Sequence, residues 1–142
     1  MNKFSLYPYL FPFRTRLQRR LRGERMQTDY STFAAGIGEG PYREAIIRFL
    51  WDCLREERAF VADFRPDTSD DLAKVYAMGP EEIVDDFLEP LTTQLSLDVE
   101  DVDFKTLGFH SINTVADFAH FMMRLAASQE GKQPDRLDAS AG

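Results

Sequence analysis

Residues 103–125, DFKTLGFHSINTVADFAHFMMRL, contain the densest pattern in the chain and decide how its fold is interpreted. A loop sequence breaks at Gly108 and reaches Ser111, and from Thr114 onward the pattern becomes helical. Apolar residues then recur at positions i, i+3, i+4, i+7 and i+11, which places them on one face of a helix. They are Val115, Phe118, Ala119, Met122 and Ala126. The stretch therefore predicts a helix over residues 114–127.

The loop before this helix has a recognisable chemical design. A glycine turn followed by a serine at a helix start would hold the hydroxyl beside free N–H groups and the positive end of the helix dipole, which favours a phosphodiester. The motif Leu107-Gly108-Phe109-His110-Ser111-Ile112, with the upstream pair Asp103-Phe104, resembles the prosthetic-group site of acyl and peptidyl carrier proteins. The resemblance implies that Ser111 is a candidate attachment site for 4′-phosphopantetheine.

Charge is distributed unevenly along the 142 residues. The chain has a net charge of −7, yet residues 1–25 contain seven Lys and Arg residues and a single acid, Glu24. This segment carries +6, so residues 26–142 carry −13. An acidic body argues against nucleic acid as the main partner, because phosphate backbones bind basic surfaces. It suits binding to a basic surface on another protein.

The sequence offers little support for catalysis or metal binding. Cys53 is the single cysteine, so an intramolecular disulfide is impossible, which fits a reducing compartment, and we expect the cytoplasm. Two histidines and one cysteine, widely separated, lack the spacing of a zinc site. His110 is adjacent to Ser111, a geometry that rarely lets a histidine activate a serine. We therefore expect no enzyme and no metal, and no apolar run reaches transmembrane length.

Residues 1–40 read as a basic arm followed by a linker. Aromatic residues in the first 13 positions are interrupted by Pro8 and Pro12, arginines follow, and glycines recur at positions 36, 38 and 40. We expect residues 1–40 to be flexible, with residues 1–25 able to make weak contact with an anionic membrane surface. The arm also resembles a mitochondrial transit peptide in being Arg-rich and acid-poor, and Met26 is an alternative start.

The remaining pattern is helical. It predicts helices over residues 41–57 and 81–95, a short segment over 72–78, and a kink or an early end at Pro90. Apolar residues alternate with acids over residues 95–104, and we expect a loop that plugs the core rather than a strand. Residues 128–142 are expected to be a disordered tail. The prediction is an all-α, small irregular helical bundle.

Two alignments with the four-helix carrier proteins follow. In the first, residues 41–127 form an acyl-carrier-like domain, residues 80–95 match the second helix, and Thr114-Val115 opens the last one. Gly79, Pro80 and Glu81 then stand where carriers have the attachment serine. The segment LSLDVEDVDF that follows this helix, residues 95–104, resembles a bacterial family of uncharacterised acyl-carrier-like proteins that lack this serine. This alignment implies a domain without an arm. We favour it because it accounts for every predicted helix.

In the second alignment, residues 81–95 match the first carrier helix and Ser111 carries the arm, which makes the chain a true acyl or peptidyl carrier. A third hypothesis is a small helical adaptor or regulatory protein unrelated to carriers. Under the first alignment, carrier resemblance implies that an acid cluster binds a basic patch on a partner enzyme. The cluster consists of Glu81, Glu82, Asp85, Asp86 and Glu89.

Overall fold

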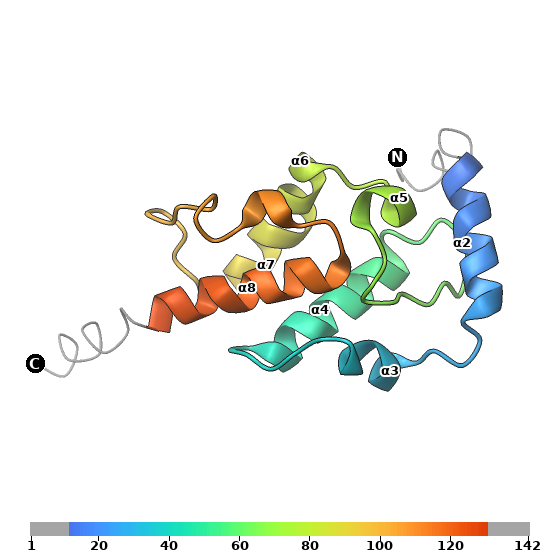
Figure 1. The fold of residues 1–142 in the computed structure, drawn as a ribbon, viewed down its shortest axis with the longest axis horizontal. Coiled ribbons are helices and arrows are strands. Elements are labelled where there is room, and N and C mark those ends of the chain that lie inside the picture. Colours follow the sequence, from blue (N-terminus) through green and yellow to red (C-terminus); the bar gives the residue numbers. More distant parts are fainter. Residues whose placement is uncertain (1–11, 131–142) are drawn as a thin grey trace, which may run out of the picture.

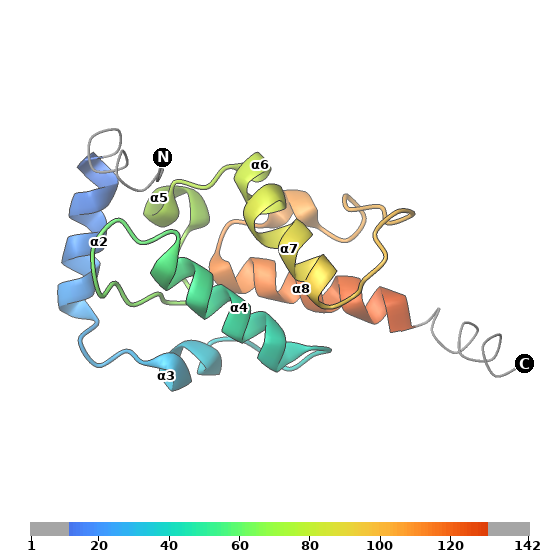
Figure 2. The ribbon, with the colours of Figure 1, turned by 180° about the vertical axis from the view of Figure 1, so that it is seen from behind.

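The computed structural model of the chain describes residues 12–130, which form an all-α bundle without a β-strand in that range (Figures 1 and 2). In chain order the elements are α2 (Pro12–Glu24), α3 (Tyr30–Ala35), α4 (Arg43–Glu56), α5 (Leu72–Tyr76), α6 (Pro80–Glu82), η2 (Ile83–Leu88), α7 (Glu89–Gln94), η3 (Phe109–Ser111) and α8 (Val115–Glu130). Element η2 is a π-helical segment, and η3 is a single 3-10 turn. The predicted fold class is therefore confirmed.

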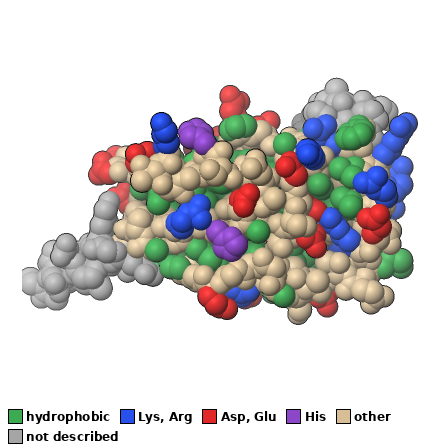
Figure 3. Space-filling model, in the orientation of Figure 1, with side chains coloured by type: hydrophobic (Ala, Val, Ile, Leu, Met, Phe, Trp, Pro, Cys, Tyr) green, Lys and Arg blue, Asp and Glu red, His purple; other side chains and the backbone are tan. Residues whose placement is uncertain are grey.

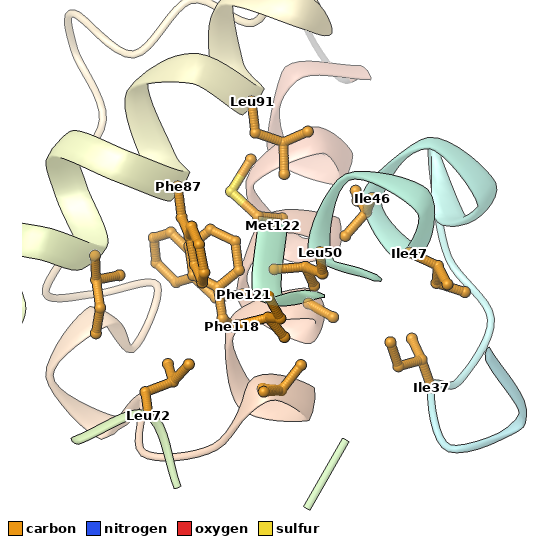
Figure 4. Close-up of a cluster of buried hydrophobic side chains, with 14 of the residues drawn as sticks. Ile37, Ile46, Ile47, Leu50, Leu72, Phe87, Leu91, Phe118, Phe121 and Met122 are labelled. Atoms are coloured by element: carbon orange, nitrogen blue, oxygen red, sulfur yellow. The ribbon is translucent and has the colours of Figure 1, made fainter. Parts of the chain in front are cut away.

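The core lies where α4 and α8 pack against each other and against the run from α6 to α7 (Figure 4). Leu50 of α4, Phe87 of η2 and Phe118 of α8 are all buried. The rings of Phe87 and Phe118 are 5.4 Å apart at their centroids, a tilted contact worth about 1 kcal/mol beyond the apolar area it buries. The helical periodicity that predicted α8 thus corresponds to its buried face.

The helical run that begins at Pro80 does not end at Pro90, where the sequence predicts a kink or an early end. Proline cannot donate to the carbonyl four residues back. Immediately before it, the Glu89 N–H bonds to Val84 O, five residues back, as in a π-helix. The run therefore changes its hydrogen-bond pattern at the proline and continues to Gln94.

The long connection between α7 and α8 has the predicted character. It contains no strand, and its apolar side chains are half-buried against the core. Phe104, for example, lies 6.1 Å from Phe121 of α8, centroid to centroid. Gly108 adopts a left-handed φ of 90°, so the break predicted at this residue is observed.

Residues 12–40 depart from the flexible arm and linker that the sequence predicts, because they contain α2 and α3. Gln18 of α2 is fully buried. Its amide donates to Val75 O at 2.8 Å and accepts from the Phe60 N–H at 2.7 Å. Phe33 of α3 belongs to the core. A polar side chain that satisfies distant backbone groups leaves no periodic signal in the sequence, which explains the missed packing.

The ends of the chain limit two further predictions. Residues 1–11 of the expected arm and residues 131–142 of the expected tail lie outside the described residues. Helix α8 extends to Glu130, three residues past its predicted end at 127, so it includes the first residues assigned to the tail.

A short turn centred on Asp70 connects three parts of the fold. The buried Asp70 carboxylate accepts two hydrogen bonds from the Arg25 guanidinium and one from the Tyr76 hydroxyl at 2.6 Å. The backbone carbonyls of Thr68 and Asp70 accept the N–H groups of Ala116 and Val115, at 2.9 and 3.1 Å. The turn therefore caps the start of α8 while it holds α5 and the end of α2.

We predict that Asp70→Ala lowers the free energy of unfolding by about 3–5 kcal/mol, because it leaves the largely buried Arg25 guanidinium unpaired. Urea denaturation followed by circular dichroism measures the change. The exposed Asp101→Ala serves as a control and should change stability by less than about 0.5 kcal/mol. A loss for Asp70→Ala no larger than that of the control would contradict this role.

Candidate functional site

The start of the α6–α7 run presents a group of exposed carboxylates. Pro80 occupies the first helical turn, where its missing N–H costs nothing, and Glu81 and Glu82 lie beside the positive end of the helix dipole. Asp and Glu side chains are visible over α6 at the top of Figure 3. We define the acidic helix face as the four exposed acids of this run. They are Glu81, Glu82, Asp85 and Glu89.

Asp86, the fifth predicted docking acid, has a structural partner instead. It forms an ion pair with Arg58, whose side chain is 3% exposed against 26% for Asp86. A buried guanidinium requires a counter-charge, because desolvation of an unpaired ion costs several kcal/mol. The π-helical turn of η2 carries Asp86 on the side of the run that faces Arg58. We therefore exclude Asp86 from the acidic helix face.

A hollow of about 310 Å³ opens beside the acidic helix face. It is lined by Pro80, Glu81, Val84, Asp85 and Phe109. Three of these five lining residues are apolar, and two carboxylates border the hollow. Phe109 comes from the loop before α8 and is held by an edge-on contact with the ring of Phe121, 5.7 Å away. The structure thus brings together the acid cluster and the loop that contains Ser111.

A second hollow, of about 380 Å³, lies at the beginning of the α6–α7 run. Gly79 and Pro80 line it on the helix side, and His110 and Asn113 come from the loop before α8. Lys74 of α5 contributes a cation. The two hollows share Pro80, so they form adjoining depressions along one junction between the run and the loop.

Ser111 is exposed at the end of η3, four residues before α8 begins. It does not occupy the cap position, which belongs to a reciprocal pair. The Asp117 N–H donates to Thr114 Oγ1 at 3.1 Å, and the Asp117 carboxylate accepts from the N–H groups of Thr114 and Asn113 at 3.0 Å each. Ser111 therefore lacks the helix-start environment that the motif suggests.

The Asp117 cap has an electrostatic signature. Partial burial disfavours the charged carboxylate, but the backbone N–H groups of Thr114 and Asn113 outweigh it, and the pKa of Asp117 falls below its usual value. A carboxylate with a lowered pKa stabilises the fold above its unfolded-state pKa and loses that contribution as the pH falls through the folded one. The cap thus fixes the start of α8 at neutral pH.

Other reactive groups are placed unfavourably for chemistry. Burial, with a smaller contribution from nearby Glu57 and Asp52, raises the pKa of the Cys53 thiol to about 12, so it remains protonated and a poor nucleophile at neutral pH. Within residues 12–130, no cluster of His, Cys, Asp and Glu side chains could hold a metal ion. None of the helices in this described part is long and apolar enough to cross a membrane.

Two contributors to the site were not identified from the sequence. Arg58, in a loop, carries no local sign that it is buried opposite Asp86. Phe109 lies inside the carrier-like motif, in which the predicted site residue is Ser111. Its position directly after Gly108, whose left-handed φ turns the chain, is the one available signal that its ring is directed at the core.

Comparison of the chain with family models, with curated proteins and with solved structures finds no match.

We predict that Asp86→Ala and Asp85→Ala change the free energy of unfolding by different amounts. Asp86→Ala should lower the free energy of unfolding by about 2–4 kcal/mol, because the buried Arg58 guanidinium loses its ion pair with Asp86. Asp85→Ala, one residue away and exposed, should change it by less than about 0.5 kcal/mol. Thermal and urea denaturation measure both. Equal effects would show that the ion pair does not distinguish the two acids.

Proposed function

We propose that this chain is a non-enzymatic docking domain of acyl-carrier-like type, which binds a partner protein through the acidic helix face. The observation that carries the proposal is that exposed carboxylates border a partly apolar hollow where the α6–α7 run meets the loop before α8. Charged groups give selectivity and fast association, whereas a buried apolar contact contributes most of the affinity. The site offers both to a basic partner surface.

The geometry suggests what such a partner presents. Glu81, Asp85 and Glu89 recur every four residues, so they follow one another along the run at roughly one helical turn each. A partner with Arg or Lys side chains at similar spacing could pair with them, and Arg can do so through two parallel hydrogen bonds. An apolar side chain between those cations would occupy the hollow at Val84 and Phe109.

The order of elements supports the arm-less version of the carrier resemblance. Helix α4, a connection that contains α5, the α6–α7 run, a second long connection that contains η3, and α8 follow one another as the first alignment requires. At the start of the run, the position of the carrier serine is occupied by Gly79 as cap and Pro80 as first residue. Cys53 is the single cysteine of the chain and permits no intramolecular disulfide, which fits the cytoplasmic location that we propose.

We predict that incubation with coenzyme A and a broad-specificity phosphopantetheinyl transferase leaves the intact mass unchanged. The reason is that Ser111 lies on an exposed 3-10 turn without a helix N-terminus behind it. Mass spectrometry of the wild type and of Ser111→Ala measures the outcome. A gain of one phosphopantetheine in the wild type and none in the variant would instead identify the chain as a true carrier.

We predict that Glu81→Lys combined with Asp85→Lys abolishes binding to the partner, because both substitutions place cations against its basic surface. Crosslinking and affinity capture from the native organism identify candidates, and titration calorimetry with the purified partner then measures the dissociation constant. We expect it to rise at least a hundredfold, since each close charge pair is worth about 1.5 kcal/mol or more.

Glu100→Lys combined with Asp101→Lys is the matched control, because it makes the same change in net charge on exposed acids of the loop between α7 and α8. Binding that survives in this control and disappears in the first variant supports the acidic helix face. Equal loss in both variants would indicate attraction to net charge alone. Unchanged binding in both would reject this face as the docking site and favour an unrelated adaptor.

A further inference from the structure

Helix α2 has two faces with different partners. One face turns to the body, where Arg14 and Arg22 donate to the backbone carbonyls of Ala73 and Ala62, and Arg25, directly after the helix, donates to Arg65 O, at 2.7–3.1 Å. Gln18, fully buried, lies on the same face. The hydrogen bonds of these four side chains hold α2 to residues 58–75.

The opposite face of α2 points away from the body. Arg16, Arg19 and Arg20 are exposed, and Phe13, one turn before Arg16, is 68% exposed. Residues three, four and seven apart share a helix face, so Phe13, Arg16 and Arg20 form one strip. With half-buried Leu17 they line a hollow of about 320 Å³. Lys and Arg side chains gather at this edge of the molecule in Figure 3.

The exposed ring of Phe13 beside Arg16 and Arg20 gives the outer face of α2 both a cationic and an apolar component. None of the arginines of this strip is needed to hold α2, because its other face already does so. The residues that precede α2 extend the same composition, since they include Lys3 and six large apolar or aromatic side chains. They are Phe4, Leu6, Tyr7, Tyr9, Leu10 and Phe11. This sequence leads directly into the end of α2 where Phe13 is exposed.

We propose that the outer face of α2 binds the surface of an anionic phospholipid membrane. Arg16, Arg19 and Arg20 would pair with lipid phosphates, while Phe13 enters the boundary between headgroups and acyl chains, where aromatic rings are favoured. Arginines alone would also attract nucleic acid or an acidic protein, but their combination with the exposed ring of Phe13 favours the membrane surface. The lipid interface takes both kinds of group.

The charge distribution of the whole molecule orients this contact. Helix α2 lies at one end of the bundle, and the loop between α7 and α8 lies at the other in both views (Figures 1 and 2). That loop carries the exposed acids Asp98, Glu100, Asp101 and Asp103. An anionic surface attracts the first end and repels the second, so the acidic helix face stays accessible to solvent.

The test is co-sedimentation of the full chain with vesicles of phosphatidylcholine alone or mixed with phosphatidylglycerol. We expect binding to the anionic vesicles only, weakened by added salt. Arg20→Glu should reduce the partition coefficient roughly tenfold or more, because a reversal removes one attraction and adds one repulsion. Phe13→Ala should reduce the partition coefficient both with and without added salt, since the contribution of the Phe13 ring is not electrostatic.

Lys105→Glu is the matched control, because it makes the same charge change on an exposed residue of the loop between α7 and α8 and should leave binding within twofold. Circular dichroism verifies that each variant is folded. Equal loss in Lys105→Glu, equal binding to neutral vesicles, or full binding by Arg20→Glu would overturn the proposal. So would self-association through Arg20 without binding to vesicles, which would make a second copy the occupant of the face.

Discussion

The buried carboxylate of Asp70 is the constraint on which the arrangement of this bundle depends. Helix α5 has only five residues and would not be stable in isolation, while α2 contributes few apolar groups. The Arg25–Asp70–Tyr76 contact supplies the missing fixation, and the backbone of the same turn caps α8. Gly36 contributes to this junction, because a Cβ there would lie 2.1 Å from Thr68 Oγ1. The turn at Asp70 thus both caps α8 and holds α2 and α5 in place.

At two places in the molecule, neighbouring side chains of the same charge have different roles. Asp86 neutralises buried Arg58, while its neighbour Asp85 faces solvent beside the hollow. In the same way, Arg22 is bound to a backbone carbonyl while Arg20 is exposed. Residues that look equivalent in sequence therefore divide into those that hold the fold and those available to partners. The two available sets, acidic on the α6–α7 run and basic on α2, have opposite sign and separate surfaces, so one domain could bridge a basic protein and an anionic membrane.

Much of this organisation follows from sequence periodicity, and the remainder depends on contacts between distant residues. Apolar recurrence predicts α4, α8 and the run at 80–94, because burial of one helix face is a local property of the pattern. The attachment of α2 rests on Gln18 and Arg25, whose partners lie 40 or more residues away. The acid cluster was recognised as a group, but nothing local distinguishes Asp86 from Asp85. Phe109 joined the site through the tertiary position of its loop.

The π-helical turn of η2 also determines which residues before and after it share a helix face. A π-turn accommodates one residue more than an α-turn, so the residues before it are rotated relative to those after it by about 100° compared with an unbroken α-helix. A chain shortened by one residue in this segment could keep every helix and still present a different set of side chains at Pro80 and Glu81. Relatives of this protein that share its surface must therefore keep the same residue count across positions 83–88, even where the residues themselves differ.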